Sequence, residues 1–293
     1  MNHAQLRAFH AVAENKGFSA AARNLGLTQP ALTLQVQALE QRYNTKLFTR
    51  RGRKTHITAP GKMLLNLSRR IFSLENEAHT LLSSLETLKI GHLKIAAPSS
   101  IYALHTAAAF QEKYPEITIG FSTGTYKKID EEILDYRADI AFFDAPPINN
   151  QYYCQKIYDE PIKVAVSERH PWRDRESVPM HQLESQRAII SINEMAKGQG
   201  RNHWSHRVKY NKDDLLIVEN REISREAVAN NMGISYFTPT EVSGDNRIHL
   251  VELEGQKLRM EIFGICLAER RDSQLISKFF EISADLRALK NDV

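Results

Sequence analysis

Short polar side chains gather on one face of a predicted helix over Gln29–Arg42. The opposite face is apolar, because Leu32, Val36 and Leu39 recur at helical spacing. Off that stripe lie hydroxyl and amide side chains, which can bond base edges in the major groove of DNA. We therefore predict a helix that reads bases, and its candidate contact residues are Gln29, Pro30, Thr33 and Gln35.

A second short helix and a turn are expected to position this reading helix. Ser19 is a good cap residue, and it starts a predicted helix over Ser19–Leu25. Gly26 can take the left-handed conformation that ends a helix, and Thr28 can cap the next one. The pattern indicates a helix-turn-helix, in which the second helix reads DNA. The alternative is an ordinary antiparallel helix pair.

Positive charge follows the reading helix directly. Residues 42–54 hold six Lys and Arg and no acid. Leu47–Arg50 and Thr55–Thr58 are two predicted short strands around a turn at Gly52, the pattern of a wing. A positive hairpin suits the phosphate backbone and the minor groove. The candidate residues for these contacts are Arg50, Arg51 and Arg53.

These first sixty residues resemble the LysR-type transcriptional regulators. The matching stretches are QLRAFHAVAENKGFSAAARNLGLTQPALTLQVQALE, LFTRR and ITAPG. The resemblance is strong over residues 1–90 and continues more weakly to the C-terminus. Many members carry a basic residue where this chain has Leu34, so the base contacts and the operator cannot be carried over. The resemblance implies a sequence-specific regulator whose activity depends on a small-molecule effector and which contacts RNA polymerase.

Composition supports double-stranded DNA as a partner. Residues 1–90 hold thirteen Lys and Arg against five Asp and Glu, whereas the remainder of the 293 residues is acidic. Cys154 and Cys266 are too few for a disulfide framework and suit a reducing cytoplasm. They form no Cys/His cluster, so we expect no metal and no cofactor. No apolar stretch approaches eighteen residues, so we expect no membrane span.

A long helix is predicted after the wing, with Thr58 as its cap. Apolar residues recur there with heptad spacing at Leu64, Leu67, Ile71, Leu74, Ala78, Leu81, Leu85 and Leu88. Such a seam favours a coiled-coil linker that forms a homodimer, over a helix lying on its own effector domain. The resemblance also suggests a homotetramer.

Residues 90–293 alternate short apolar strands with helices, which predicts an α/β fold with a largely parallel sheet. The resemblance implies a two-subdomain effector domain like a periplasmic binding protein. Subdomain I then covers about 90–161 and 263–293, and subdomain II about 162–262. With the all-α winged helix-turn-helix domain at 1–58 and the linker at 59–89, this completes the expected organisation.

Small polar residues follow several predicted strands, where ligands bind in parallel α/β sheets. Hydroxyls, helix N-termini and one arginine would together suit a small anion. The candidates are Ser99, Ser100, Thr123, Thr125, Asn220 and Arg221, with Asn193 and Thr238 as further candidates. Helix capping for the polar residues, and a solvated charge for Arg221, are the alternatives that remain open.

Four stretches resemble a LysR subgroup that accompanies genes for aminoethylphosphonate breakdown: QLRAFHAVAE, QRY, FSLENEA and ILDYRADIA. A small phosphonate or carboxylate is therefore the expected effector. The rival hypothesis is an α/β enzyme with a fused nucleic-acid-binding domain, and another is a structural nucleoid protein. We find no nucleophile elbow, Gly-rich phosphate loop or paired metal ligands, so we predict no catalytic residues.

Overall fold

The computed structural model describes residues 1–51, 54–83, 91–146, 150–195, 207–208 and 213–291. It divides into two compact units. The first comprises Met1–His79 and Asp135–Arg137, and the second comprises Thr80–Leu134 and Ala138–Val293. Each unit is described below by itself.

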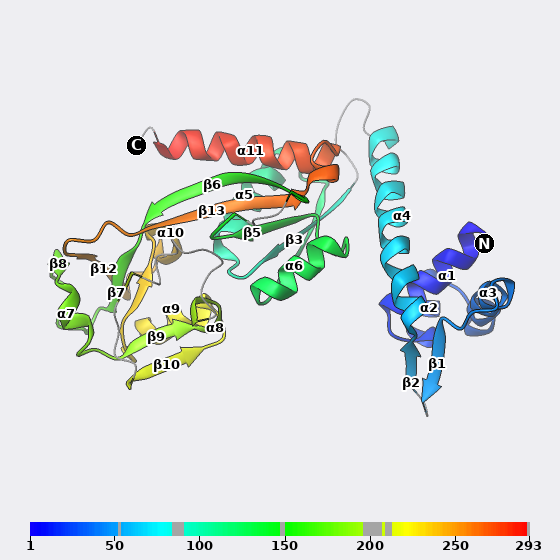
Figure 1. Cartoon of the computed structure of the whole chain (residues 1–293). Coiled ribbons are helices and arrows are strands. Elements are labelled where there is room, and N and C mark those ends of the chain that lie inside the picture. The colour runs from blue at the N-terminus through cyan, green and yellow to red at the C-terminus, as the bar shows by residue number, and fades with distance from the viewer. Residues whose placement is uncertain (52–53, 84–90, 147–149, 196–206, 209–212, 292–293) are drawn as a thin grey trace. The chain divides into compact units, whose positions relative to one another are not determined.

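The first unit begins with three helices: α1 (His3–Glu14), α2 (Phe18–Leu25) and α3 (Gln29–Arg42) (Figure 1). Gly26 ends α2 at φ +66°, and the Thr28 hydroxyl accepts from the N–H of Ala31, so the predicted turn and cap are confirmed. Leu32, Val36 and Leu39 are at most 2% exposed. The apolar stripe therefore holds α3 against α1 and α2.

The start of α2 differs from the prediction. Its N-cap is Gly17, and no side chain caps it. The Ser19 hydroxyl instead donates to Gln29 Oε1 at 2.8 Å. Ser19 lies inside the helix because α2 begins one residue earlier than predicted, at Phe18. The prediction of Ser19 as a cap was wrong.

The wing is an antiparallel pair of β1 (Phe48–Arg51) and β2 (Lys54–Ile57), within one residue of the expected strands. Its tip, with the predicted contact residue Arg53, lies outside the described residues. Helix α4 (Ala59–Ser83) follows, and the N–H of Gly61 donates to Thr58 Oγ1 at 3.1 Å, so Thr58 caps it as predicted. The last two heptad positions, Leu85 and Leu88, also lie outside the described residues.

The second unit contains a five-stranded sheet in the order β4-β3-β5-β13-β6. Its strands are β3 (His92–Ala97), β4 (Thr118–Thr123), β5 (Ile140–Phe143), β6 (Tyr152–Pro161) and β13 (Arg259–Leu267). Helices α5 (Ile101–Lys113) and α11 (Gln274–Asn291) pack together through Phe110 and Phe279, whose ring centroids are 5.5 Å apart. Helix α6 (Tyr126–Leu134) lies on the opposite face (Figure 1).

The same unit contains two smaller sheets, joined by a bridge between Ala188 and Ile234. One has the order β11-β7-β12-β8 and the other pairs β9 with β10. Their strands are β7 (Lys163–Ser167), β8 (Ser177–Val178), β9 (Ala188–Ser191), β10 (Leu215–Val218), β11 (Ser235–Phe237) and β12 (Ile248–Leu253). The helical segments are α7 (Met180–Leu183), α8 (Ile192–Met195), α9 (Arg221–Ala229), α10 (Pro239–Val242) and η2 (Ala268–Arg270).

The expectation of a largely parallel sheet is only half right. β3 is parallel to β4 and β5, but β13 is antiparallel to both β5 and β6. β7 likewise has antiparallel neighbours on both sides. The reason is β6, which the sequence analysis did not predict. It runs alongside β13 from Tyr152 to Pro161. The strand that leads from the five-stranded sheet to the smaller sheets therefore pairs with the strand that leads back.

Candidate functional site

The N-terminal candidate site is the outer face of α3. Gln29 and Pro30 are exposed there, whereas Thr33 and Gln35 are half-buried. The bond from Ser19 holds the Gln29 amide at the start of the helix, and the Thr33 hydroxyl donates back to the Gln29 carbonyl at 2.8 Å. The helix N-terminus therefore presents one fixed amide group and one hydroxyl whose oxygen can still accept.

A buried carboxylate fixes the wing relative to α3. Glu40 accepts hydrogen bonds from Lys46 Nζ at 2.9 Å and from the N–H groups of Leu47 and Phe48 at 2.8 and 3.1 Å. Burial acts to raise the pKa of Glu40, but these donors outweigh it and lower the pKa below the usual 4.5. The basic strand that carries Arg50 and Arg51 therefore starts from a defined point beside the reading helix.

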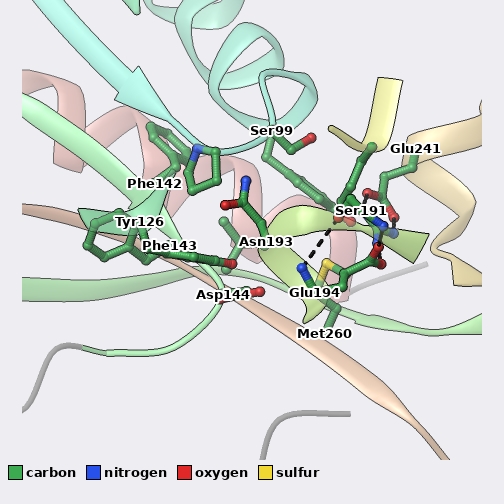
Figure 2. A pocket seen from close by; sticks show the side chains of 14 residues that line it. Ser99, Tyr126, Phe142, Phe143, Asp144, Ser191, Asn193, Glu194, Glu241 and Met260 are labelled. Carbon is green, nitrogen blue, oxygen red and sulfur yellow. Dashed lines mark hydrogen bonds and ion pairs between the residues drawn. The ribbon is translucent and has the colours of Figure 1, made fainter. Parts of the chain in front are cut away.

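The second candidate site is a pocket in the second unit (Figure 2). It lies where β3, β5 and β9 end and lead into loops and helices, as expected for parallel strands. Helices α6, α9 and α10 and strand β13 complete its wall. Its lining residues are Pro98, Ser99, Tyr102, Tyr126, Phe142, Phe143, Asp144, Ser191, Asn193, Glu194, Arg221, Glu241, Met260 and Ile262. The cavity measures about 40 Å³, which holds only a few water molecules.

Arg221 is the buried cation of this pocket. Its guanidinium pairs with Glu194, donates to both carboxylate oxygens of Glu241 at 2.5 and 2.7 Å, and donates to the Tyr236 carbonyl at 2.8 Å. Burial acts to lower the pKa of Arg221, but Glu241 and Glu194 outweigh it and raise the pKa well above its usual range. Arg221 is therefore a charged group that the chain itself neutralises.

Aromatic rings and a further carboxylate form the other side of the pocket. Tyr126 packs against Phe143 with ring centroids 5.4 Å apart. Burial, together with the charge of Asp144 and a hydrogen bond to it, raises the pKa of Tyr126 well above its usual range. Tyr126 therefore stays a neutral donor to Asp144. Among the described residues, the charged groups that line the pocket are one arginine and three carboxylates, so this part of the lining is formally acidic.

The predicted anion position at the start of α5 is occupied by the chain itself. Glu222 Oε1 accepts from the Ser99 hydroxyl at 3.3 Å and from both the N–H and the hydroxyl of Ser100 at 2.8 Å. Serine hydroxyls and a helix N-terminus thus do bind an anion here, and that anion is a side chain of α9. Ser99 lines the pocket, whereas Ser100 does not.

The remaining predicted residues have structural roles, and only Asn193 lines the pocket. Its amide donates to the Gly124 carbonyl at 3.5 Å, so the loop that carries Thr123 and Thr125 contributes a backbone group. The Thr123 carbonyl and the Thr125 hydroxyl accept from Lys128 Nζ and N, respectively.

Asn220 and Thr238 act as helix caps. The Asn220 side chain caps α9 by accepting from Ile223, and Thr238 caps α10 in a capping box with Glu241. The Thr238 hydroxyl is also hydrogen-bonded to Tyr102 at 2.5 Å. The capping alternative therefore describes both residues, although Thr238 also contacts the pocket wall.

The predicted site residues did not include the carboxylates Asp144, Glu194 and Glu241, which line the pocket, or Glu222, which accepts from Ser99 and Ser100. For two of them, the local sequence contains a feature that could have indicated their position. Asp144 directly follows a predicted strand, and Glu241 stands three residues after a threonine, the spacing of a capping box. Nothing in the local sequence indicated that Glu194 would reach Arg221, because 27 residues separate the two.

Among the described residues, no cluster of three metal-ligating side chains occurs, and no helix is long and apolar enough to span a bilayer. The two units thus define a protein with a helix-turn-helix head and an α/β unit that contains a small polar pocket. Residues 3–62 match the model of the bacterial regulatory helix-turn-helix protein, lysR family, and residues 87–287 match the LysR substrate binding domain. The chain belongs to the LysR family of transcriptional regulators.

Its relatives agree with this assignment. The chain is 25% identical to the transcriptional activator CmpR of Synechocystis, over 80% of this chain and 78% of the relative. It is also 25% identical to the transcriptional regulator CysL of Bacillus subtilis, over 82% of this chain and 81% of the relative. This chain is therefore a DNA-binding regulator with an effector-binding domain and not an enzyme, so the enzyme alternative is excluded.

Solved structures share the fold. A cysteine variant of full-length OxyR from Pseudomonas aeruginosa superposes with a TM-score of 0.73 at 18% identity, covering 99% of this chain and 95% of that one. CbnR in complex with its target DNA gives a TM-score of 0.67 at 20% identity, covering 98% of this chain and all of that one. The expected fold class is thereby confirmed.

Proposed function

We propose that this regulator is controlled by a small molecule that binds in the pocket of the second unit. The supporting observation is that the pocket lies between elements of the five-stranded sheet and elements of the two smaller sheets, and that these elements also contact each other. Glu222 bonds Ser100, Asn193 bonds the Gly124 carbonyl, and Thr238 bonds Tyr102. Such contacts can hold the pocket closed or let it open. A ligand that replaces or strengthens them would bind the open and the closed pocket with different affinities, and this difference in affinity is what a regulator needs.

The charges argue against a purely anionic effector. Arg221 is neutralised by two carboxylates, and the serines at the start of α5 already bind Glu222. A simple phosphonate or carboxylate would have to displace one of these internal pairs while facing the negative charge of Asp144. The acidic lining and the rings of Tyr126 and Phe143 instead favour a cationic group such as an ammonium.

We therefore propose a zwitterionic effector, with aminoalkyl phosphonates as the first candidates. Its ammonium group would lie at Asp144 among the aromatic rings. Its phosphonate would take the place of the Glu222 carboxylate on Ser99 and Ser100. The sequence resemblance to the aminoethylphosphonate subgroup supports the same class. Because the cavity is only about 40 Å³, binding also requires the walls of the pocket to move apart.

The test is calorimetry of the full-length protein with 2-aminoethylphosphonate and with its two halves, ethylphosphonate and ethylamine. The zwitterion should bind at least tenfold more tightly than either half, and Asp144→Asn should remove that advantage. Asp174→Asn is the matched control, since its side chain is 81% exposed. Equal affinity for ethylphosphonate and the zwitterion would exclude the ammonium position.

On the DNA side, we propose that α3 enters the major groove. Gln29, Pro30, Thr33 and Gln35 would then lie at the bases, while Arg50, Arg51 and Arg53 bind phosphates. Exposed apolar residues on α4 support a homodimer through that helix, since Leu67, Leu74 and Leu81 are 54–58% exposed. A homotetramer, contact with RNA polymerase and action in the cytoplasm complete the proposal. The naming of one relative as an activator supports the polymerase contact.

A further inference from the structure

Leu34 is an exposed apolar side chain in the middle of α3. It is 64% exposed, whereas Leu32 and Val36 on either side of it are buried. Successive residues of a helix are about 100° apart, so Leu34 points away from the core that its neighbours build. No packing role in the first unit explains a leucine at this position.

The α3 residues that surround Leu34 are proline, alanine and glutamine, and none of them is negatively charged. Pro30, Gln37 and Gln41 share its face at helical spacing, and all three are exposed. The one carboxylate of α3, Glu40, is 7% exposed and bonded to the start of the wing. The face around Leu34 therefore presents nothing that would repel a polyanion.

We infer that Leu34 reads thymine by contact with its methyl group. A leucine side chain cannot hydrogen-bond to a base, and the C5-methyl of thymine is the apolar group that base edges offer in the major groove. Glutamines on the same face can bond the adenine of a neighbouring or paired position. This inference rests on α3 entering the major groove, and it adds an apolar specificity contact to the hydrogen bonds that the amide and hydroxyl groups can make.

A protein partner is the other conceivable occupant, and the structure favours DNA. The apolar residues suited to a chain partner lie on α4, whereas Leu34 lies on the reading helix between Pro30 and Gln37. One exposed leucine between a proline and glutamines offers less apolar area than a protein interface, whose centre is built from several large apolar side chains.

The experiment uses the full-length protein and a binding site recovered by selection from randomised duplex DNA. Each thymine of that site is replaced in turn by 2′-deoxyuridine, which removes only the methyl group, and affinity is measured by fluorescence anisotropy. Loss of one buried methyl should weaken binding about fourfold at the positions that Leu34 contacts. In Leu34→Ala the same replacements should have no effect.

Three controls keep the result interpretable. Leu34→Met should retain the discrimination, because methionine offers similar apolar contact. Met63→Ala removes another exposed apolar side chain of the first unit, 72% exposed and outside α3, and should also retain it. Melting of Leu34→Ala should match wild type. Equal binding of thymine and uracil sites by wild type would overturn the inference, as would unchanged discrimination by Leu34→Ala. If the selection recovers no site, α3 entry into the groove is itself refuted.

Discussion

Removing Arg221 should destabilise the second unit far more than removing an exposed arginine with a similar set of partners. Its side chain is 12% exposed, and those of Glu194 and Glu241 are 9% and 4% exposed. Arg221→Met leaves both carboxylates buried without their cation. Breaking a buried ion pair from one side costs about 3–5 kcal/mol. For a unit of this size, that loss lowers the melting temperature by roughly 6–20 °C.

The matched control is Arg247→Met. Arg247 also bonds two carboxylates, Asp245 and Glu226, but its side chain is 47% exposed, so water can replace the lost partner. Its melting temperature should stay close to wild type. Differential scanning calorimetry of the full-length protein measures all variants.

The double variant Arg221→Met/Glu194→Gln tests the cause. Because it removes one of the two stranded charges, it should recover part of the loss seen in Arg221→Met. If Arg221→Met melts within about 2 °C of wild type, which is less than 1 kcal/mol for a unit of this size, the buried triad does not stabilise the fold. If the double variant is no more stable than the single one, unpaired charge is not the origin of the loss.

Two further predictions concern the first unit and the linker. The depressed pKa of Glu40 means that its stabilisation is complete above about pH 4.5 and is lost as pH falls through the lower folded value. The hydrogen-exchange protection factors of residues 3–42, which correct for the intrinsic pH dependence of exchange, should therefore fall in acid for wild type. In Glu40→Gln they should be low both at neutral pH and in acid; protection factors of wild type that do not change with pH would contradict this. Leu74, 58% exposed, should lie in the dimer seam, so Leu74→Asp, which would bury a charge there, should weaken association by several kcal/mol and give monomers in sedimentation. An intact Leu74→Asp dimer would move the interface away from α4.

The helix-turn-helix could be predicted because local rules determine it. Gly26 takes a positive φ that few other residues tolerate, and Thr28 satisfies a free N–H one turn later. The spacing of Leu32, Val36 and Leu39 then fixes which face is buried. Each of these signals lies within a few residues of the feature it specifies, so the sequence alone carries them.

The antiparallel pairing of β6 with β13 could not be predicted in the same way. About one hundred residues separate Asp159 from its partner Arg259, and strand direction depends on where the chain returns. The sequence of Tyr152–Pro161 alternates polar and apolar residues only partly, and it comes shortly after Pro146 and Pro147. Long-range pairing of this kind leaves no local signal.

The carboxylate partners of Arg221 could not be predicted for the same physical reason. An arginine at the start of a helix, after a strand, can bind a ligand anion or an internal carboxylate, and both require the same residue types. Glu241 and Glu194 lie 20 and 27 residues away from Arg221, and only the fold brings them to it. The sequence identified the position of the cation, whereas its partners depend on tertiary contacts.

Glu222 connects these charges to regulation. It belongs to α9, directly after Arg221, and binds Ser100 at the start of α5. The carboxylate thus occupies an anion position and links α9 to α5. Because Glu222 is exposed, water competes with this link and it contributes little energy. A ligand phosphonate need overcome only that small energy to replace it. In the proposed mechanism, the ligand substitutes its own contacts for a weak contact within the protein. The arrangement that binds the ligand and the one held by Glu222 would then differ in affinity for it, at little cost to the stability of the fold.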